Sequence, residues 1–471
     1  MNMIDNTVVS VALPTIQRDL NVDLSALEWI VNVYALMFAV FLLTGGKLAD
    51  YFGRRRVFTL GLTVFIVASL FAGLAASGEW LISARAVQGL GAALMMPATL
   101  AIISATFEPR ERALAIGVWA GVAASGLAIG PLVGGLFTDT IGWSWIFYVN
   151  VPVGLIGIIA ARFLIDESRD QSAEQRLDTP GLLVSAITLF ALTFAIVEGN
   201  SLGWSSPTIL LLFGLSLVGL VAFIALERRQ RSPMLNLSLF RNRTFAGATG
   251  VAMLQTFSMF GMFLFIAIYL QRVLGYSAIG AGAAILPQTI VVIAVAPTAG
   301  RLVNRFGSRL LMTVGLTLNG IALLLLSRLG TGSEFIDLWP AFVIGGIGMG
   351  LTTTPMTAAA LSAVPTDMAG VGSGVLTTAR QVGVALGIAV MGAIIATQTG
   401  EIAGSTGTPE EFVKGFTLAL RVSAGVAFGA ALLALTTIRR LKHPPDLPGV
   451  RAAEASRNRD PIRPETAPEL T

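Results

Sequence analysis

The amino-acid sequence predicts an all-α polytopic membrane protein, and two properties of the 471-residue chain lead to this prediction. Hydrophobic residues make up 54% of the chain and charged residues only 12%, so no soluble core could bury its apolar surface. The apolar residues also lie in runs long enough to cross a hydrocarbon layer that is about 30 Å thick. We count about 14 such runs, each of them a predicted transmembrane helix.

The predicted helices are separated by short polar breaks. They lie at residues 1–17, 26–46, 57–76, 80–105, 113–138, 144–165, 180–198, 207–226, 244–271, 279–300, 308–328, 338–362, 370–397 and 413–438.

One polar break occurs twice, which predicts two related halves of the chain. Residues 46–57 read Gly-Lys-Leu-Ala-Asp-Tyr-Phe-Gly-Arg-Arg-Arg-Val, and residues 300–310 read Gly-Arg-Leu-Val-Asn-Arg-Phe-Gly-Ser-Arg-Leu. Internal repeats of this kind are common in transporters. The second copy keeps the turn glycines, but its aspartate has become Asn304 and its first arginine Ser308. The charged residues are therefore expected to act in the first copy.

Basic residues collect in breaks that all fall on one side of the membrane, which predicts the orientation of the chain. They include Lys47, Arg54, Arg55, Arg56, Arg110, Arg112, Arg228, Arg229, Arg231, Arg301, Arg305, Arg309, Arg439 and Arg440. By the positive-inside rule these breaks face the cytoplasm, and an even number of spans places both termini on the same side.

Missing residue types restrict the chemistry. The chain has no cysteine, and its single histidine, His443, lies in the tail, which excludes disulfides, thiolate metal sites and imidazole chemistry inside the membrane. No lysine is followed by Ser or Thr, so a phosphate-binding loop is absent. The basic residues do not form a basic domain, which argues against nucleic acid. We therefore expect no cofactor, metal, nucleotide or nucleic-acid partner, and no enzymatic activity.

The first predicted span is shorter than the others. Asp5 has only four residues before it, and a helix from Asp5 to Thr15 rises about 15 Å, half of the hydrocarbon thickness. This favours a true start upstream of Met1, with a half-length span in a locally thinned bilayer as the alternative.

Three charged residues lie inside predicted spans, where a charge costs a few kcal/mol unless it faces a partner or a wet cavity. They are Asp5, Arg85 and Arg380. For Asp5 and Arg85, a proton or substrate site is favoured over an ion pair that only joins two helices. Arg380 could instead extend toward the cytoplasm. Glu28 and Glu198 lie at span ends, where solvation accounts for them.

The fifth predicted span combines small residues with a proline. Its distinctive residues are Gly126, Gly130, Pro131, Gly134 and Gly135. Glycines at every fourth position remove side chains from one helix face, and the proline forfeits one backbone hydrogen bond. We expect a bendable helix that packs closely, with helix packing alone as the alternative to a role in transport.

Four segments resemble signatures of one transporter family. Residues 46–57 look like the loop between helices two and three of the major facilitator superfamily, residues 81–93 are similar to its helix-four signature, and residues 126–135 resemble the helix-five signature of its antiporter branch. Residues 5–14 look like the helix-one motif of the fourteen-span drug:proton antiporter family, with Ser10 where an asparagine is usual. The motifs occur in the expected order, so the resemblance covers nearly the whole chain.

The resemblance implies the major facilitator fold, in which two six-helix bundles enclose a central cavity that opens alternately to each side. The N-terminal bundle would be residues 1–165, with its first span truncated, and the C-terminal bundle residues 244–440. Residues 166–243 would hold two inserted spans and cytoplasmic linkers, and residues 441–471 a disordered cytoplasmic tail.

The resemblance also implies roles for particular residues. Proton coupling is assigned to Asp5 and Arg85. The gating loop comprises Gly46, Asp50, Gly53 and Arg54, with Asp50 facing the start of span thirteen, a favourable place for an anion at a helix N-terminus. The candidate residues of the substrate cavity are Gln88, Met253, Phe257, Phe260 and Arg380, for which ordinary packing or lipid contact is the alternative.

The implied function is proton-coupled export of a small lipophilic substrate across the inner membrane by a monomer. A cationic substrate is one option, because one buried acid fits both proton coupling and cation binding. Two alternatives share the fold: a proton-coupled metabolite importer or symporter, against which the fifth-span glycines and proline argue, and an exporter of an endogenous natural product.

Overall fold

The computed structural model describes residues 2–107, 126, 129–169, 178–230, 233, 235, 237–364, 369–399 and 408–439, whose regular structure is helical. The first helices are α1 (Asn2–Leu20), α2 (Leu24–Phe52), α3 (Arg54–Gly73), α4 (Gly78–Thr106), α6 (Trp145–Tyr148) and α7 (Asn150–Leu164). The helices that follow are α8 (Thr179–Val197), α9 (Gly199–Leu202), α10 (Pro207–Arg229), η1 (Leu237–Arg241), α11 (Arg243–Ile268), η2 (Tyr269–Val273), α12 (Ala278–Leu326), α13 (Phe335–Ser362), α14 (Ala369–Thr399) and α15 (Pro409–Thr437).

Within the described residues, 12 helices are long and apolar enough to cross a membrane. They coincide with the predicted spans other than the first and the fifth, and α12 contributes two of them. α1 is helical but is not among the 12, and the fifth predicted span, 113–138, lies mostly outside the described residues. The polytopic all-α fold class is confirmed, and the count of fourteen spans stays a prediction.

Local sequence signals explain where helices begin and end. Asp23 precedes α2, and its carboxylate accepts a hydrogen bond from the backbone N–H of Ala26 at 2.8 Å. Gly53 ends α2 with a φ of 110°, and Gly307 bends α12 with a φ of 77°. These two glycines hold matching positions in the repeated loop motif. Both copies therefore make a sharp turn between consecutive spans.

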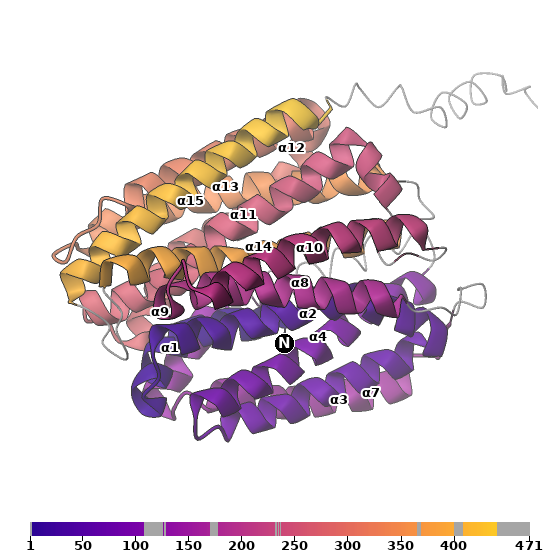
Figure 1. Cartoon of the computed structure of the whole chain (residues 1–471), viewed down its shortest axis with the longest axis horizontal. Coiled ribbons are helices and arrows are strands. Elements are labelled where there is room, and N and C mark those ends of the chain that lie inside the picture. Colours follow the sequence, from indigo (N-terminus) through magenta and orange to yellow (C-terminus); the bar gives the residue numbers. More distant parts are fainter. Residues whose placement is uncertain are drawn as a thin grey trace, which may run out of the picture.

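The helices form two bundles that face each other (Figure 1). In the first bundle α4 packs against α2 and α3, and α3 packs against α7. In the second bundle α12 packs against α13 and α15, and α11 packs against α14. Contacts of α1 with α11 and of α2 with α14 join the bundles, and the largest cluster of buried apolar side chains extends through both. This arrangement is the two-bundle fold that the sequence predicts.

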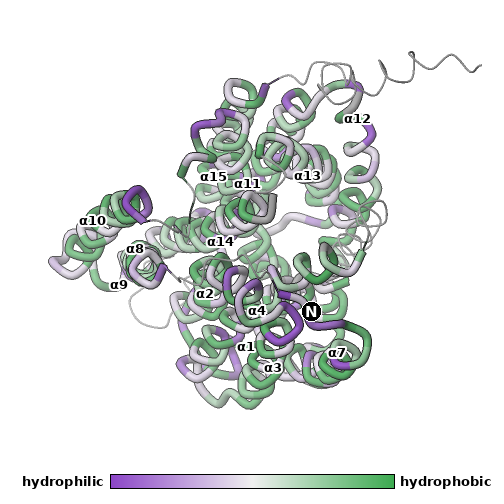
Figure 2. Tube along the Cα trace, turned by 90° about the vertical axis from the view of Figure 1, so that its right-hand side faces the viewer, coloured by the Kyte–Doolittle hydropathy of each residue, from purple (hydrophilic) through white to green (hydrophobic). Residues whose placement is uncertain are grey.

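α8, α9 and α10 form an inserted hairpin at one side of the body (Figure 2). α8 packs against both α2 and α14. At the α9 end, the Glu198 carboxylate accepts hydrogen bonds from Ser25 Oγ at 2.7 Å and Trp29 Nε1 at 3.0 Å, both on α2. Asn200 Nδ2 donates to the backbone oxygen of Ala393 on α14 at 2.7 Å. The hairpin therefore holds one helix of each bundle, and Glu198 has a structural task beyond solvation.

The Glu198→Ala variant is expected to lower the stability of the protein in detergent. It removes the acceptor of the two bonds to α2, and each hydrogen bond to a charged group contributes about 1.5–3 kcal/mol. Thermal unfolding followed by light scattering should show a fall of several degrees in the midpoint. Glu410→Ala, at an exposed position in the first turn of α15, is the matched control and should lower the midpoint far less, because it removes only an interaction with the helix dipole. Equal midpoints for the two variants would contradict the assignment.

Candidate functional site

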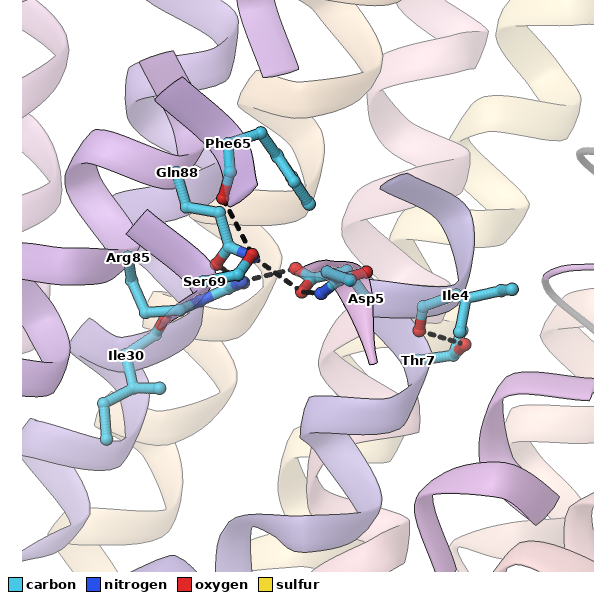
Figure 3. A network of polar contacts seen from close by, with 9 residues as sticks. Ile4, Asp5, Thr7, Ile30, Phe65, Ser69, Arg85 and Gln88 are labelled. Atoms are coloured by element: carbon cyan, nitrogen blue, oxygen red, sulfur yellow. Dashed lines mark hydrogen bonds and ion pairs between the residues drawn. The ribbon is translucent and has the colours of Figure 1, made fainter. Parts of the chain in front are cut away.

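A buried ion pair joins Asp5 of α1 to Arg85 of α4 inside the first bundle (Figure 3). The Asp5 side chain is 1% exposed and that of Arg85 is fully buried. Taking two charges out of water is costly, and their attraction repays this cost only with good geometry and additional hydrogen bonds. The sequence predicts these residues as one site, and the structure places them in direct contact.

Gln88 connects the ion pair to α3. Its Oε1 accepts a hydrogen bond from Arg85 Nη1 at 2.6 Å, while its Nε2 donates to Asp5 Oδ1 at 2.9 Å and to Ser69 Oγ at 2.8 Å. Asn150 Nδ2 donates a longer bond to Asp5 Oδ1 at 3.4 Å. Gln88 was expected in the substrate cavity, but it is fully buried in this network instead. Ser69 and Asn150 were not predicted, because a neutral polar residue in an apolar run gives little signal in a sequence.

An aromatic ring and a backbone oxygen fix the Arg85 guanidinium. Its Cζ lies 4.2 Å from the centroid of the Tyr34 ring, and its Nε donates to the backbone oxygen of Ile30 at 3.1 Å. Removing one partner of a buried pair typically costs 3–5 kcal/mol, because the other charge stays behind. The ion pair therefore contributes to holding α1 against α4.

The glycines of the fifth predicted span lie in close contact with both bundles. A Cβ at Gly134 would lie 2.9 Å from the backbone oxygen of Val8 on α1, and one at Gly135 would lie 2.5 Å from that of Ala278 on α12. Reciprocally, a Cβ at Gly282 of α12 would lie 2.3 Å from the backbone oxygen of Pro131. The small residues thus allow this segment to contact α1 and α12 at once. Gly130 faces Thr7 of α1 in the same way, and Gly126 is buried.

Asp139, at the end of the same helical segment (129–140), extends this contact. Its two carboxylate oxygens accept hydrogen bonds from the backbone N–H groups of Ala278 at 3.2 Å and Ile279 at 2.8 Å. These are the first amides of α12, where an anion is stabilised by the helix dipole. The packing of this segment against α12 brings the carboxylate to these amides. The bundles are therefore joined at the end of the molecule opposite Gly53.

The predicted gating loop contains an ion pair of its own. Arg54 Nη2 lies 3.0 Å from Asp50 Oδ1, one turn apart in the chain. Gly53 supplies the positive φ between them, and Gly46 lies near Pro97 of α4. Asp50 was expected to face the start of span thirteen. The side chains of residues 365–370 at that start lie outside the described part of the chain. A contact of Asp50 with that helix stays a prediction.

A cavity lies between the two bundles. It is lined from α1, the fifth predicted span and three helices of the second bundle by Thr7, Ser10, Val11, Pro131, Phe260, Phe263, Ile285, Gln288, Thr289, Val292 and Met349. Of the residues predicted for the cavity, only Phe260 is among them. Met253 and Phe257 instead pack against α14. A Cβ at Gly383 would lie 2.2 Å from the backbone oxygen of Met253, and one at Gly387 would lie 2.2 Å from that of Phe257.

Arg380 lies on α14 away from this lining. Its Nη2 donates to Thr357 Oγ1 at 2.9 Å, and its backbone oxygen accepts from Thr256 Oγ1 at 2.8 Å. Arg380 has no carboxylate within salt-bridge distance in the described part of the chain. In the same residues, no group of three or more His, Cys, Asp or Glu side chains could hold a metal ion.

Several known proteins are similar to this chain in sequence or in fold. A sequence model of the Major Facilitator Superfamily matches residues 1–388. The chain is 38% identical over 397 residues to the multidrug resistance protein Stp of Mycobacterium tuberculosis, covering 84% of this chain and 74% of that protein. It is 37% identical over 446 residues to the puromycin resistance protein pur8 of Streptomyces alboniger, covering 93% and 88%. It is 34% identical over 404 residues to the tetracenomycin C resistance and export protein of Streptomyces glaucescens, covering 85% and 75%.

Among solved structures, a bacterial homologue of the human lysosomal transporter Spinster superposes with a TM-score of 0.64. That structure is described as inward-facing and unoccupied. The match covers 93% of this chain and 94% of that one at 19% identity, and it supports the fold alone.

Proposed function

Because the chain belongs to the major facilitator superfamily, we propose that it exports small lipophilic molecules in exchange for protons. The observation that carries the proposal is the ion pair of Asp5 and Arg85, since an ionisable residue inside a membrane bundle marks a substrate or proton pathway. Relatives named for multidrug resistance, puromycin resistance, and tetracenomycin C resistance and export support export of foreign or natural compounds.

α1 carries both the coupling group and part of the cavity. Asp5 faces Arg85 in the first bundle, whereas Thr7 and Ser10, within the next two turns, line the cavity. Protonation of Asp5 neutralises the carboxylate and weakens its attraction to Arg85, so α1 gains freedom to move against α4. Substrate in the cavity favours one position of α1 and a proton on Asp5 the other. Each ligand then shifts the same equilibrium by its differential affinity for the two states.

Such coupling requires two states, which we assign to two arrangements of the bundles relative to each other. The contacts of the fifth-span glycines and Asp139 with α12 close one end of the interface between the bundles. We propose that this end faces outward and that the Gly53 end, where basic residues gather, faces the cytoplasm, with both chain termini. A monomer in the inner membrane is sufficient for this mechanism.

Transport direction tests the proposal in cells. An efflux-deficient bacterial host that expresses the protein should accumulate less puromycin or fluorescent dye than a host that expresses Asp5→Asn, and a proton uncoupler should abolish the difference. Equal membrane amounts of the two proteins, measured by immunoblot, are the control. Higher accumulation in the expressing host would identify the metabolite importer or symporter mode instead. A difference that survives the uncoupler would reject proton coupling.

A further inference from the structure

Among the described residues that line the cavity between the bundles, none has an ionisable side chain. Its lining consists of aliphatic and aromatic residues, one methionine, one proline, and the neutral polar residues Thr7, Ser10, Gln288 and Thr289. A charged group transferred to such a site loses its hydration and finds no counter-ion. The volume of about 30 Å³ holds a water molecule but no drug, so the bundles must separate before a substrate enters.

Asp5 and Arg380, two of the charged residues inside the spans, already have other partners. The Asp5 carboxylate binds Arg85 and Gln88 (Figure 3). Arg380 donates to Thr357. A cationic substrate would therefore have to break the ion pair of Asp5 to find an anion, and it would leave Arg85 without its carboxylate.

Gln288 is the buried polar group that the cavity leaves unsatisfied. It is 1% exposed, and its Oε1 has no hydrogen-bond partner among the described residues. Gly345 of α13 lies next to this amide. A Cβ at Gly345 would be 3.5 Å from Gln288 Nε2. A buried acceptor without a donor destabilises the protein until water or a ligand supplies one. Gln288 can thus bind an N–H or O–H of a molecule in the cavity.

An aromatic and thioether surface lies across the same cavity. The rings of Phe260 and Phe263 are 6.1 Å apart in an edge arrangement, and Met349 adds a flexible thioether. Such a surface binds flat apolar molecules of varied shape.

We infer that the substrates are neutral lipophilic molecules that carry a hydrogen-bond donor, and that Gln288 is the residue that recognises this donor. The inference rests on the proposed export function, because it names the substrate class of the same cavity. It replaces the cationic substrate that the sequence left open.

Binding to the purified protein in nanodiscs tests the inference with three probes. N-phenyl-1-naphthylamine is neutral and has one N–H donor, its N-methyl derivative lacks the donor, and tetraphenylphosphonium is a permanent cation. Fluorescence titration should give N-phenyl-1-naphthylamine a Kd roughly tenfold lower than its N-methyl derivative, which is the effect of about one hydrogen bond. Tetraphenylphosphonium, followed by displacement of bound N-phenyl-1-naphthylamine, should bind most weakly.

Two substitutions assign the effect to Gln288. Gln288→Leu should remove the tenfold preference for the donor, while Gln381→Leu, the same change outside the cavity, should preserve it. Gln288→Glu should increase binding of tetraphenylphosphonium and keeps the inference testable even if Gln288→Leu does not fold. The preference persisting in Gln288→Leu, or tetraphenylphosphonium binding most tightly to the wild type, would overturn the inference.

These titrations need no proton gradient, so their result is separate from the export assay. Loss of coupling with intact donor preference would reject the proposed function alone. Proton-driven export with no donor preference would reject only the role of Gln288.

Discussion

Asp5→Asn is expected to reduce substrate-driven proton movement at least tenfold in proteoliposomes. Asparagine retains an oxygen that accepts the hydrogen bond of Gln88, but it neither binds a proton nor offers a charge to Arg85. Pyranine enclosed in the vesicles reports the proton flux when substrate is added. Exchange of labelled for unlabelled substrate, which requires no net proton transfer, should continue.

Stability has to be separated from coupling in this experiment. Asp5→Asn leaves Arg85 as a buried charge without a counter-ion, which costs about 3–5 kcal/mol. The double variant Asp5→Asn with Arg85→Gln removes both charges and should regain stability without regaining proton flux. Glu410→Gln, at an exposed site, is the matched control. An unchanged proton-to-substrate ratio in Asp5→Asn would exclude Asp5 from coupling.

Gly282→Ala is expected to open the end of the molecule at which Asp139 contacts α12. The added Cβ would lie 2.3 Å from the backbone oxygen of Pro131, so the fifth-span segment and α12 must separate. Gly280→Ala places its Cβ 3.4 Å from the nearest atom, an ordinary contact, and serves as control on the same helix. A change of about 1.4 kcal/mol in the equilibrium between the two states alters their ratio tenfold.

The absence of cysteine makes this opening measurable without removing native thiols. Ser10→Cys introduces one thiol into the cavity lining. Its labelling by a membrane-impermeant methanethiosulfonate added from outside should be about tenfold faster in Gly282→Ala than in Gly280→Ala. Asp139→Asn, which removes charge from the α12 contact, should accelerate it less. Equal rates in the two glycine variants would show that this contact does not close the cavity.

The sequence predicts the fold class and the placement of Asp5 and Arg85 in one site for the same physical reason. Long apolar runs can only be membrane helices, and Asp5 and Arg85 interrupt them with a cost that demands a partner. Gln88 was expected in the substrate cavity, whereas its amide lies between Arg85, Asp5 and Ser69, because a helix signature does not tell which neighbouring helix the amide faces. Gln288 and Asn150 are neutral residues in apolar segments, so a hydropathy profile does not distinguish them from their neighbours.

Charges near span ends are the other place where sequence reasoning is limited. Glu28 was expected to be solvated, but it is 3% exposed, and a Cβ on Gly392 of α14 would stand 1.7 Å from its Oε1. The burial results from the approach of α14, a helix more than 300 residues away in the chain. No local pattern reports that a second bundle covers the end of a span.

The hairpin of α8, α9 and α10 also sets a condition on how the bundles can turn. Glu198 holds α2 and Asn200 holds α14, so the two bundles are tied together along one edge. In Figure 2 this edge lies on the side of the body opposite α12. A rotation that preserves these bonds has its axis near the α2–α14 edge, and its largest displacement falls at α12. The inserted helices would then act as a hinge that converts small movements at the tied edge into wide opening along the far one.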